Sequence, residues 1–201
     1  MNHRTFTLAC RWTLAVLMTS GLWACAPDKP SFKGVDITGA DYGKGFRLSD
    51  AQGQVRTLAD FAGKVVVVFF GYTQCPDVCP TTLQELVEVK RLLGKDGDRL
   101  QAVFITLDPE RDTTELLQAY MANFDPSFVA LHPTPEQLPV IAKDFKIYYK
   151  KVAGASATSY TLDHSAQSYT FDAQGRLRLY NRYGSGAQAL ASDVAVLLQS
   201  K

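Results

Sequence analysis

The sequence is short of cysteine and of net charge. Its 201 residues include four cysteines, and 21 basic residues face 20 acidic ones. This near balance gives no electrostatic basis for binding nucleic acid. Apolar and charged fractions of 46% and 20% are close to average, which excludes a disordered, collagen-like or repeat protein. The chain is long enough for one globular domain with short appendages.

Acidic residues are missing from the first 24 positions. This segment contains Arg4 and Arg11, followed by an apolar run from Thr13 to Ala24. A basic start before an apolar run is typical of a secretory signal. The run is too short and too rich in Thr, Ser and Gly for a membrane-spanning helix, which needs about 20 apolar residues. We therefore predict a signal peptide over residues 1–24.

The end of this segment, Leu22-Trp23-Ala24-Cys25, resembles a bacterial lipoprotein signal, although Trp23 is bulkier than usual there. In such signals the cysteine is lipidated and becomes the mature N-terminus, and several acyl chains give stable anchoring. An uncleaved anchor helix and ordinary signal-peptidase cleavage are the alternatives, and both still export the domain. We expect lipidation of Cys25, a tether over residues 25–44 and a folded domain over 45–201.

The folded part is expected to be an α/β domain. Apolar and polar residues alternate at 46–48 and 55–58 around a turn, which predicts a β-hairpin. Residues 65–70 form a continuous β-branched and aromatic run before Gly71, as expected of a strand covered on both faces. The other expected elements are a strand at 101–107, a hairpin of 168–172 with 177–180, and helices at 81–93, 113–124, 136–145 and 189–199. Pro139 fits only the first turn of its helix.

The candidate reactive residues lie between the predicted strand at 65–70 and the predicted helix at 81–93. If Cys10 leaves with the signal and Cys25 is lipidated, Cys75 and Cys79 remain. Cysteines four apart at a helix start can lie on one side, close enough for a disulfide or for one shared metal ion. The helix N-terminus favours the thiolate. A structural disulfide is the alternative, but so short a loop would contribute only about 2 kcal/mol.

A third ligand must come from a histidine, and the mature chain has His132 and His164. His132 lies between Leu131 and Pro133 in a proline-rich stretch, which favours a solvated loop imidazole. His164 follows Asp163 just before the late hairpin. By spacing alone it is either an incidental loop residue or a ligand.

Three stretches resemble the Sco/SenC family in order and spacing. They are residues 70–82 (Phe-Gly-Tyr-Thr-Gln-Cys-Pro-Asp-Val-Cys-Pro-Thr-Thr), residues 107–113 (Leu-Asp-Pro-Glu-Arg-Asp-Thr) and residues 163–165 (Asp-His-Ser). The similarity runs from about Gly45 to the C-terminus. It implies a thioredoxin-like fold, with a central mixed sheet flanked by helices and an added N-terminal β-hairpin. It also implies copper held by Cys75, Cys79 and His164.

The donor types agree with that implication. Two thiolates and one imidazole form a soft set suited to Cu(I), whereas structural zinc takes four protein ligands and Cu(II) would recruit an oxygen. Ordinary thioredoxins keep a proline opposite a CxxC motif, and no proline follows Pro139 here. By the resemblance, His164 occupies that neighbourhood. Asp108 is either an orienting residue or weak ligand for the oxidised metal, or else an Asp-Pro turn or helix-capping residue.

The resemblance implies a metallochaperone that delivers copper to the binuclear copper centre of cytochrome c oxidase during assembly. Its partners would be the copper-centre subunit and a thioredoxin-like reductant, because a disulfide has no thiolate to offer a metal. The oxidase partnership, rather than the lipoprotein signal itself, would place the lipoprotein at the inner (cytoplasmic) membrane, facing the periplasm or cell exterior. The alternative is a thiol-disulfide oxidoreductase that keeps exported cysteines reduced. Neither a signalling element nor a peroxiredoxin-type cysteine motif is present in the sequence.

Overall fold

The structure is a computed structural model that describes residues 30–155 and 159–200. The expected signal peptide and Cys25 lie outside the described residues. Within the described part, no helix is both long and apolar enough to cross a membrane. The sheet begins at β1 (Val35–Asp36), so hydrogen-bonded strand structure starts inside the segment expected to be a tether.

Two parallel strands, β4 (Val65–Gly71) and β5 (Leu100–Thr106), form the centre of the sheet, and every residue in both is buried. Their β-branched and aromatic side chains do not alternate with polar ones because layers cover both faces of the sheet. Both strands were predicted from the sequence. The phenyl rings of Phe69 and Phe104 pack across the pair with ring centroids 5.1 Å apart.

The main sheet of the described residues has eight strands in the order β1-β10-β9-β4-β5-β6-β2-β3. β4, β5 and β6 run parallel, and the remaining neighbours pair antiparallel. The other strands are β2 (Arg47–Asp50), β3 (Val55–Thr57), β6 (Val129–His132), β9 (Ser168–Phe171) and β10 (Leu177–Asn181). The predicted hairpins β2–β3 and β9–β10 are confirmed, and so is the mixed sheet.

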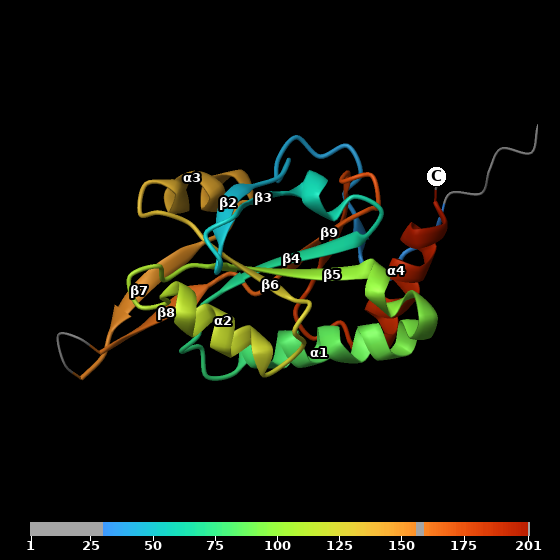
Figure 1. The fold of residues 1–201 in the computed structure, drawn as a ribbon. Helices are drawn as coiled ribbons and strands as arrows, with labels where there is room; N and C mark the ends of the chain where they lie inside the picture. The colour runs from blue at the N-terminus through green and yellow to red at the C-terminus, as the bar shows by residue number, and fades with distance from the viewer. Residues whose placement is uncertain (1–29, 156–158, 201) are drawn as a thin grey trace, which may run out of the picture. The chain divides into compact units, whose positions relative to one another are not determined.

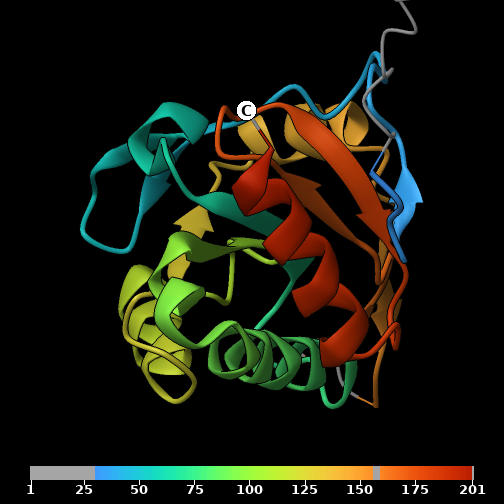
Figure 2. The ribbon, with the colours of Figure 1, turned by 90° about the vertical axis from the view of Figure 1, so that its right-hand side faces the viewer.

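Helices cover both faces of this sheet. In Figure 1, α1 (Val78–Leu93) and α2 (Thr114–Ala122) lie below the sheet and α3 (Gln137–Asp144) lies above it. Figure 2 shows α4 (Ala187–Gln199) packed beside α1. Two short 3₁₀ helices, η1 (Leu58–Phe61) and η2 (Gly94–Arg99), complete the elements. The arrangement is the expected thioredoxin-like α/β fold.

The helix predictions are confirmed with shifted ends. α1 begins three residues before the predicted start, so Cys79 lies in its first turn. Pro139 lies in the first turn of α3, where its missing N–H breaks no helical hydrogen bond. No cis peptide bond occurs in the described residues.

Besides β1, three further strands, β6, β7 and β8, were not predicted from the sequence. β6 ends at His132, whose Nε2 lies 3.2 Å from the carbonyl oxygen of Pro109. The prediction of a solvated loop histidine was therefore wrong, because His132 is half-buried at a strand end. β7 (Tyr149–Ala153) and β8 (Tyr160–His164) form a separate two-stranded sheet, which extends from the domain at the lower left of Figure 1.

Candidate metal centre

The cysteine loop joins β4 to α1. After β4 the chain turns, and the N–H of Cys75 donates to the carbonyl oxygen of Tyr72 over 3.1 Å. Helix α1 then begins at Val78, which places Cys79 in the first helical turn. Both cysteines are free thiols, with exposed fractions of 8% for Cys75 and 1% for Cys79. Cys75 is therefore the one that solvent and partners can reach more easily.

Gly71 makes room for the second sulfur. A Cβ added to Gly71 would overlap Cys79 Sγ and would lie 2.9 Å from Phe104 Cε2. Real Cβ atoms do not approach other atoms so closely, so the last residue of β4 cannot carry a side chain without moving Cys79 or Phe104. The glycine at the end of the apolar run thus belongs to the site.

Asp112 joins the cysteine loop to the end of β5 through hydrogen bonds. Its buried carboxylate accepts hydrogen bonds from the Thr73 N–H at 3.0 Å, the Thr73 hydroxyl at 2.5 Å and the Thr106 hydroxyl at 2.6 Å. Burial raises the pKa of Asp112, and these donors oppose the rise. Asp112 was not predicted to be a site residue, although it stands in the Leu-Asp-Pro-Glu-Arg-Asp-Thr stretch.

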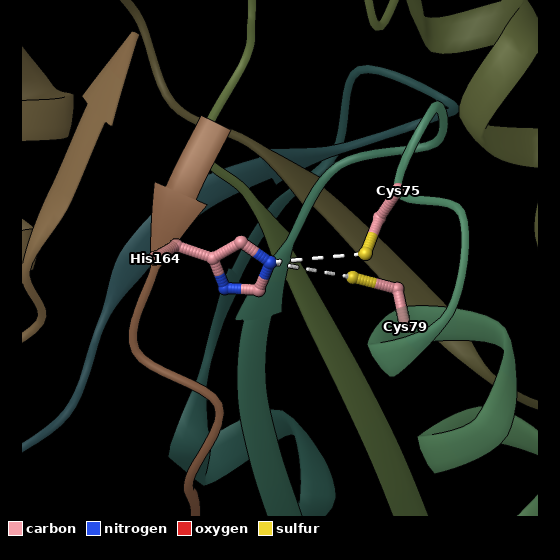
Figure 3. Close-up of side chains that lie close together, drawn as sticks. All are labelled: Cys75, Cys79 and His164. Atoms are coloured by element: carbon pink, nitrogen blue, oxygen red, sulfur yellow. Dashed lines mark hydrogen bonds between the residues drawn. The ribbon is translucent and has the colours of Figure 1, made fainter. Parts of the chain in front are cut away.

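His164 reaches the cysteines from the end of β8 (Figure 3). Its Nε2 lies 3.9 Å from Cys75 Sγ and 3.8 Å from Cys79 Sγ. Its Nδ1 lies 2.8 Å from the carbonyl oxygen of Ser165. Because a carbonyl only accepts, Nδ1 donates the proton, and in the neutral ring Nε2 turns its lone pair toward the sulfurs. The edge of this ring also packs against Tyr72, with ring centroids 5.8 Å apart.

The thiols differ in acidity. A hydrogen bond from the Cys79 thiol lowers the pKa of Cys75 to about 3. The Nε2–H of the protonated His164 ring and the N–H groups of Cys79 and Asp77 at the start of α1 also contribute to this lowering. The Cys75 thiolate and burial together raise the pKa of Cys79 above its ordinary value. Burial lowers the pKa of His164, but the hydrogen bonds with Cys75 and Ser165 outweigh it and raise the pKa. The pair thus holds one thiolate and one thiol near neutral pH.

The donor set fits one metal ion. The ligand atoms of Cys75, Cys79 and His164 all lie within 4.8 Å of one another. Metal–sulfur and metal–nitrogen bonds of about 2.3 and 2.0 Å at a trigonal angle separate the two donors by roughly 3.7 Å. The observed N–S spacings are close to that value. The arrangement can therefore hold a soft metal ion, or exchange disulfides through its two sulfurs.

Asp108 lies beside this group and not in it. The described side chains whose ligand atoms converge are the two cysteines and His164. Both carboxylate oxygens of Asp108 accept other hydrogen bonds, from the Tyr160 hydroxyl at 2.7 Å and from Arg111 Nε at 2.5 Å. Its carbonyl oxygen accepts the N–H groups of Arg111 and Asp112, as an Asp-Pro turn requires. An orienting role for Asp108 stays a prediction.

A family model and a sequence relative both match most of this chain. The family model SCO1/SenC matches residues 35–199. A SCO2-like protein from Rickettsia felis is 35% identical over 153 residues, which cover 75% of this chain and 75% of that protein.

Two solved structures agree in fold. Bradyrhizobium japonicum ScoI with copper bound is 38% identical, with a TM-score of 0.70 over 79% of this chain and 99% of that one. Apo Sco1 from Thermus thermophilus is 34% identical, with a TM-score of 0.73 over 83% of this chain and 97% of that one. Sequence, fold and the Cys-Cys-His group agree, and the chain belongs to the SCO1/SenC family.

Proposed function

We propose that this protein binds copper through Cys75, Cys79 and His164 and delivers it to the copper-centre subunit of cytochrome c oxidase during assembly. The observation that carries the proposal is the convergence of two sulfurs and one imidazole nitrogen within 4.8 Å. Copper is the cargo here, bound and then handed on. Family membership and a relative solved with copper bound support the choice of metal.

The donor chemistry favours Cu(I). Thiolates are soft ligands that select Cu(I), and a closed structural zinc site normally takes four protein ligands. The described residues bring three ligand atoms together here. A three-ligand site leaves one side open to an incoming thiolate, which cargo transfer needs. Cys75 is the more exposed sulfur, so ligand exchange would begin there.

Copper binding requires both thiols in the reduced state. Oxidation of Cys75 and Cys79 to a disulfide forms one S–S bond and releases two electrons and two protons. The disulfide leaves no thiolate for the metal. A thioredoxin-like dithiol would return the two electrons and two protons and become a disulfide itself. Such a reductant is therefore the second proposed partner.

The location is part of the proposal. A signal peptide at 1–24, lipidation of Cys25 and a tether that ends before β1 would hold the folded domain at the outer face of the inner (cytoplasmic) membrane. The support is the sequence pattern around Leu22 to Cys25. Delivery to a membrane-bound oxidase agrees with this placement.

Thiol-disulfide exchange is a second candidate function, favoured by the unequal acidity of the thiols. The Cys75 thiolate would attack a substrate disulfide and form a mixed disulfide, and the first substrate thiolate would leave and take a proton. Cys79 would then lose its proton and attack Cys75 Sγ, which releases the second substrate thiol. The substrate gains two electrons and two protons, and the Cys75–Cys79 disulfide forms.

A copper titration of the full reduced chain tests the first function. Cu(I) affinity is measured against a chromophoric chelator for the wild type and for Cys75→Ser, Cys79→Ser and His164→Ala. Each change removes a ligand, so we expect losses beyond the roughly 10- to 100-fold typical of outer contacts. His132→Ala is the matched histidine control and should bind like the wild type. Wild-type affinity in His164→Ala would contradict the proposed site.

Oxidase assembly separates the two functions. His164→Ala removes a metal ligand and keeps both thiols, so copper delivery should fail while disulfide exchange persists. We expect cells with this variant to accumulate oxidase that lacks its binuclear copper centre. Normal assembly of the oxidase in these cells would favour the oxidoreductase.

A further inference from the structure

The hairpin β7–β8, which carries His164, is not part of the main sheet. It forms its own two-stranded sheet, and no ladder in the described residues joins it to the eight-stranded sheet. An isolated two-stranded hairpin is marginally stable in water. His164 is the last residue of β8, so the position of its imidazole in front of the sulfurs depends on the contacts that hold the hairpin against the cysteine loop.

Arg111 makes contacts on both sides of the site. Its Nη1 donates to the Tyr160 carbonyl oxygen, at the start of β8, over 2.9 Å. The same nitrogen donates to Gln74 Oε1 over 3.1 Å. Gln74 directly precedes Cys75, so one nitrogen bridges the hairpin that carries His164 and the loop that carries the cysteines.

Two further contacts close this arrangement into a cluster of Asp108, Arg111 and Tyr160, which we name the arginine clamp. The Arg111 guanidinium stacks on the Tyr160 ring, with its central carbon 3.6 Å from the ring centroid. Asp108 accepts from Arg111 Nε at 2.5 Å and from the Tyr160 hydroxyl at 2.7 Å. Every member of the clamp thus contacts both others.

The clamp is largely withdrawn from water. The exposed fraction is 18% for the Arg111 side chain and 1% for that of Asp108. Arg111 Nη2 is buried without a hydrogen-bond partner among the described residues. A buried, unpaired donor is costly, which indicates that the remaining contacts determine where the guanidinium lies. Lysine has one nitrogen and no planar face, so it could not make the bridge and the stack together.

We propose that Arg111 is a positioning residue that clamps β7–β8 to the cysteine loop and so holds His164 Nε2 toward the two sulfurs before a metal binds. Its effect on copper affinity rests on the proposed function, whereas its effect on the hairpin does not. Preorganisation of this kind raises affinity because the imidazole need not be ordered at the moment of binding.

Other contacts also reach the hairpin, including the packing of the His164 ring against Tyr72. The Leu162 N–H donates to the Tyr72 hydroxyl over 3.3 Å, and Leu162 is buried. Lys151 pairs with Glu110 at 2.7 Å, with side-chain exposures of 48% and 66%. Exposed ion pairs contribute little. Glu110→Gln is therefore a matched control, because it removes this charged contact between the same hairpin and the same loop and leaves Lys151 over the Tyr160 ring.

Hydrogen–deuterium exchange of the full, reduced, metal-free chain tests the clamp without copper. In Arg111→Lys we expect the amides of residues 160–165 to exchange at least about tenfold faster, while those of β4 and β5 keep their protection. Glu110→Gln should exchange like the wild type. Tyr160→Phe keeps the ring stack and loses the hydrogen bond to Asp108. Its residues 160–165 should therefore exchange at a rate between those of Arg111→Lys and the wild type. Unchanged exchange of residues 160–165 in both Arg111→Lys and Tyr160→Phe would overturn the proposal.

A double-mutant cycle tests the coupling to His164. We expect Arg111→Lys to weaken Cu(I) binding by about 10- to 100-fold in the wild-type background and to have no further effect in His164→Ala. An equal loss in both backgrounds would show that Arg111 acts elsewhere and would overturn the positioning role. Absence of Cu(I) binding by the wild type would refute the proposed function, and the exchange result would still decide the clamp.

Discussion

His164 Nε2 lies 3.8 Å from Cys79 Sγ, although 85 positions separate the two residues in the chain. A disulfide staple would need no imidazole at this distance. The side chain that closes the site comes from a small hairpin outside the main sheet, so the properties of the site depend on both the cysteine loop and the hairpin.

Gly71→Ala should damage the site through packing. The new Cβ would overlap Cys79 Sγ and crowd Phe104, so the helix start or the ring must shift. Overpacking of this kind costs about 1–3 kcal/mol of unfolding free energy. Urea denaturation of the reduced, metal-free chain measures it. A stability equal to that of the wild type would mean that Cys79 has more room than the structure gives it.

Asp112→Ala should loosen the cysteine loop. The change leaves the buried Thr106 hydroxyl and the Thr73 N–H without their acceptor. An unsatisfied buried group costs about 1–3 kcal/mol, and we expect a loss of unfolding free energy in that range. Asp98→Ala, at a side chain that is 99% exposed, is the matched control and should change stability little. Equal stability of the two variants would contradict the role given to Asp112.

Cys75 should react with iodoacetamide in mildly acidic solution. Its pKa is lowered to about 3 by the hydrogen bond from Cys79, so it is a thiolate at pH 5, where an ordinary cysteine is protonated. Cys79 has a raised pKa and should stay unmodified. Mass spectrometry of the alkylated, metal-free chain measures both rates. A rate for Cys75 that rises only near pH 8–9 would contradict the thiolate assignment.

Asp172 should make stability sensitive to acid. Burial alone would raise its pKa, but hydrogen bonds from the Arg176 N–H and from the Arg176 and Arg178 side chains lower it. A carboxylate with a lowered folded pKa stabilises the fold above its unfolded pKa of about 3.9, and this stability is lost as the pH falls through the folded pKa. In Asp172→Asn, the melting temperature should therefore fall less between pH 6 and pH 3. A parallel fall in both proteins would contradict this.

Local patterns predicted most of the domain. The uninterrupted apolar run at 65–70 could only be a strand covered on both faces, and Cys75 and Cys79 follow it at a helix start. β6 was missed because it has only four residues and ends at His132, directly before Pro133. β7 was missed because Lys150 and Lys151 stand side by side in an exposed ribbon, which shows no alternation of apolar and polar residues.

No local sequence pattern identified the residues that hold the site in place. The resemblance to a family, and not the spacing, pointed to His164, because a loop histidine carries no mark of a distant contact. The meeting of Arg111 with Tyr160 depends on how a hairpin folds back over the loop, which sequence periodicity does not report. Asp108 was singled out from the sequence with two alternatives, and its hydrogen-bond partners, Arg111 and Tyr160, became visible only in the structure.

If one copper ion is held by two sulfurs and one imidazole nitrogen, X-ray absorption at the copper edge of the Cu(I)-loaded wild-type chain should show two sulfur neighbours and one nitrogen neighbour. In His164→Ala the nitrogen neighbour should be lost. A spectrum with sulfur neighbours alone, unchanged in His164→Ala, would contradict this ligand set.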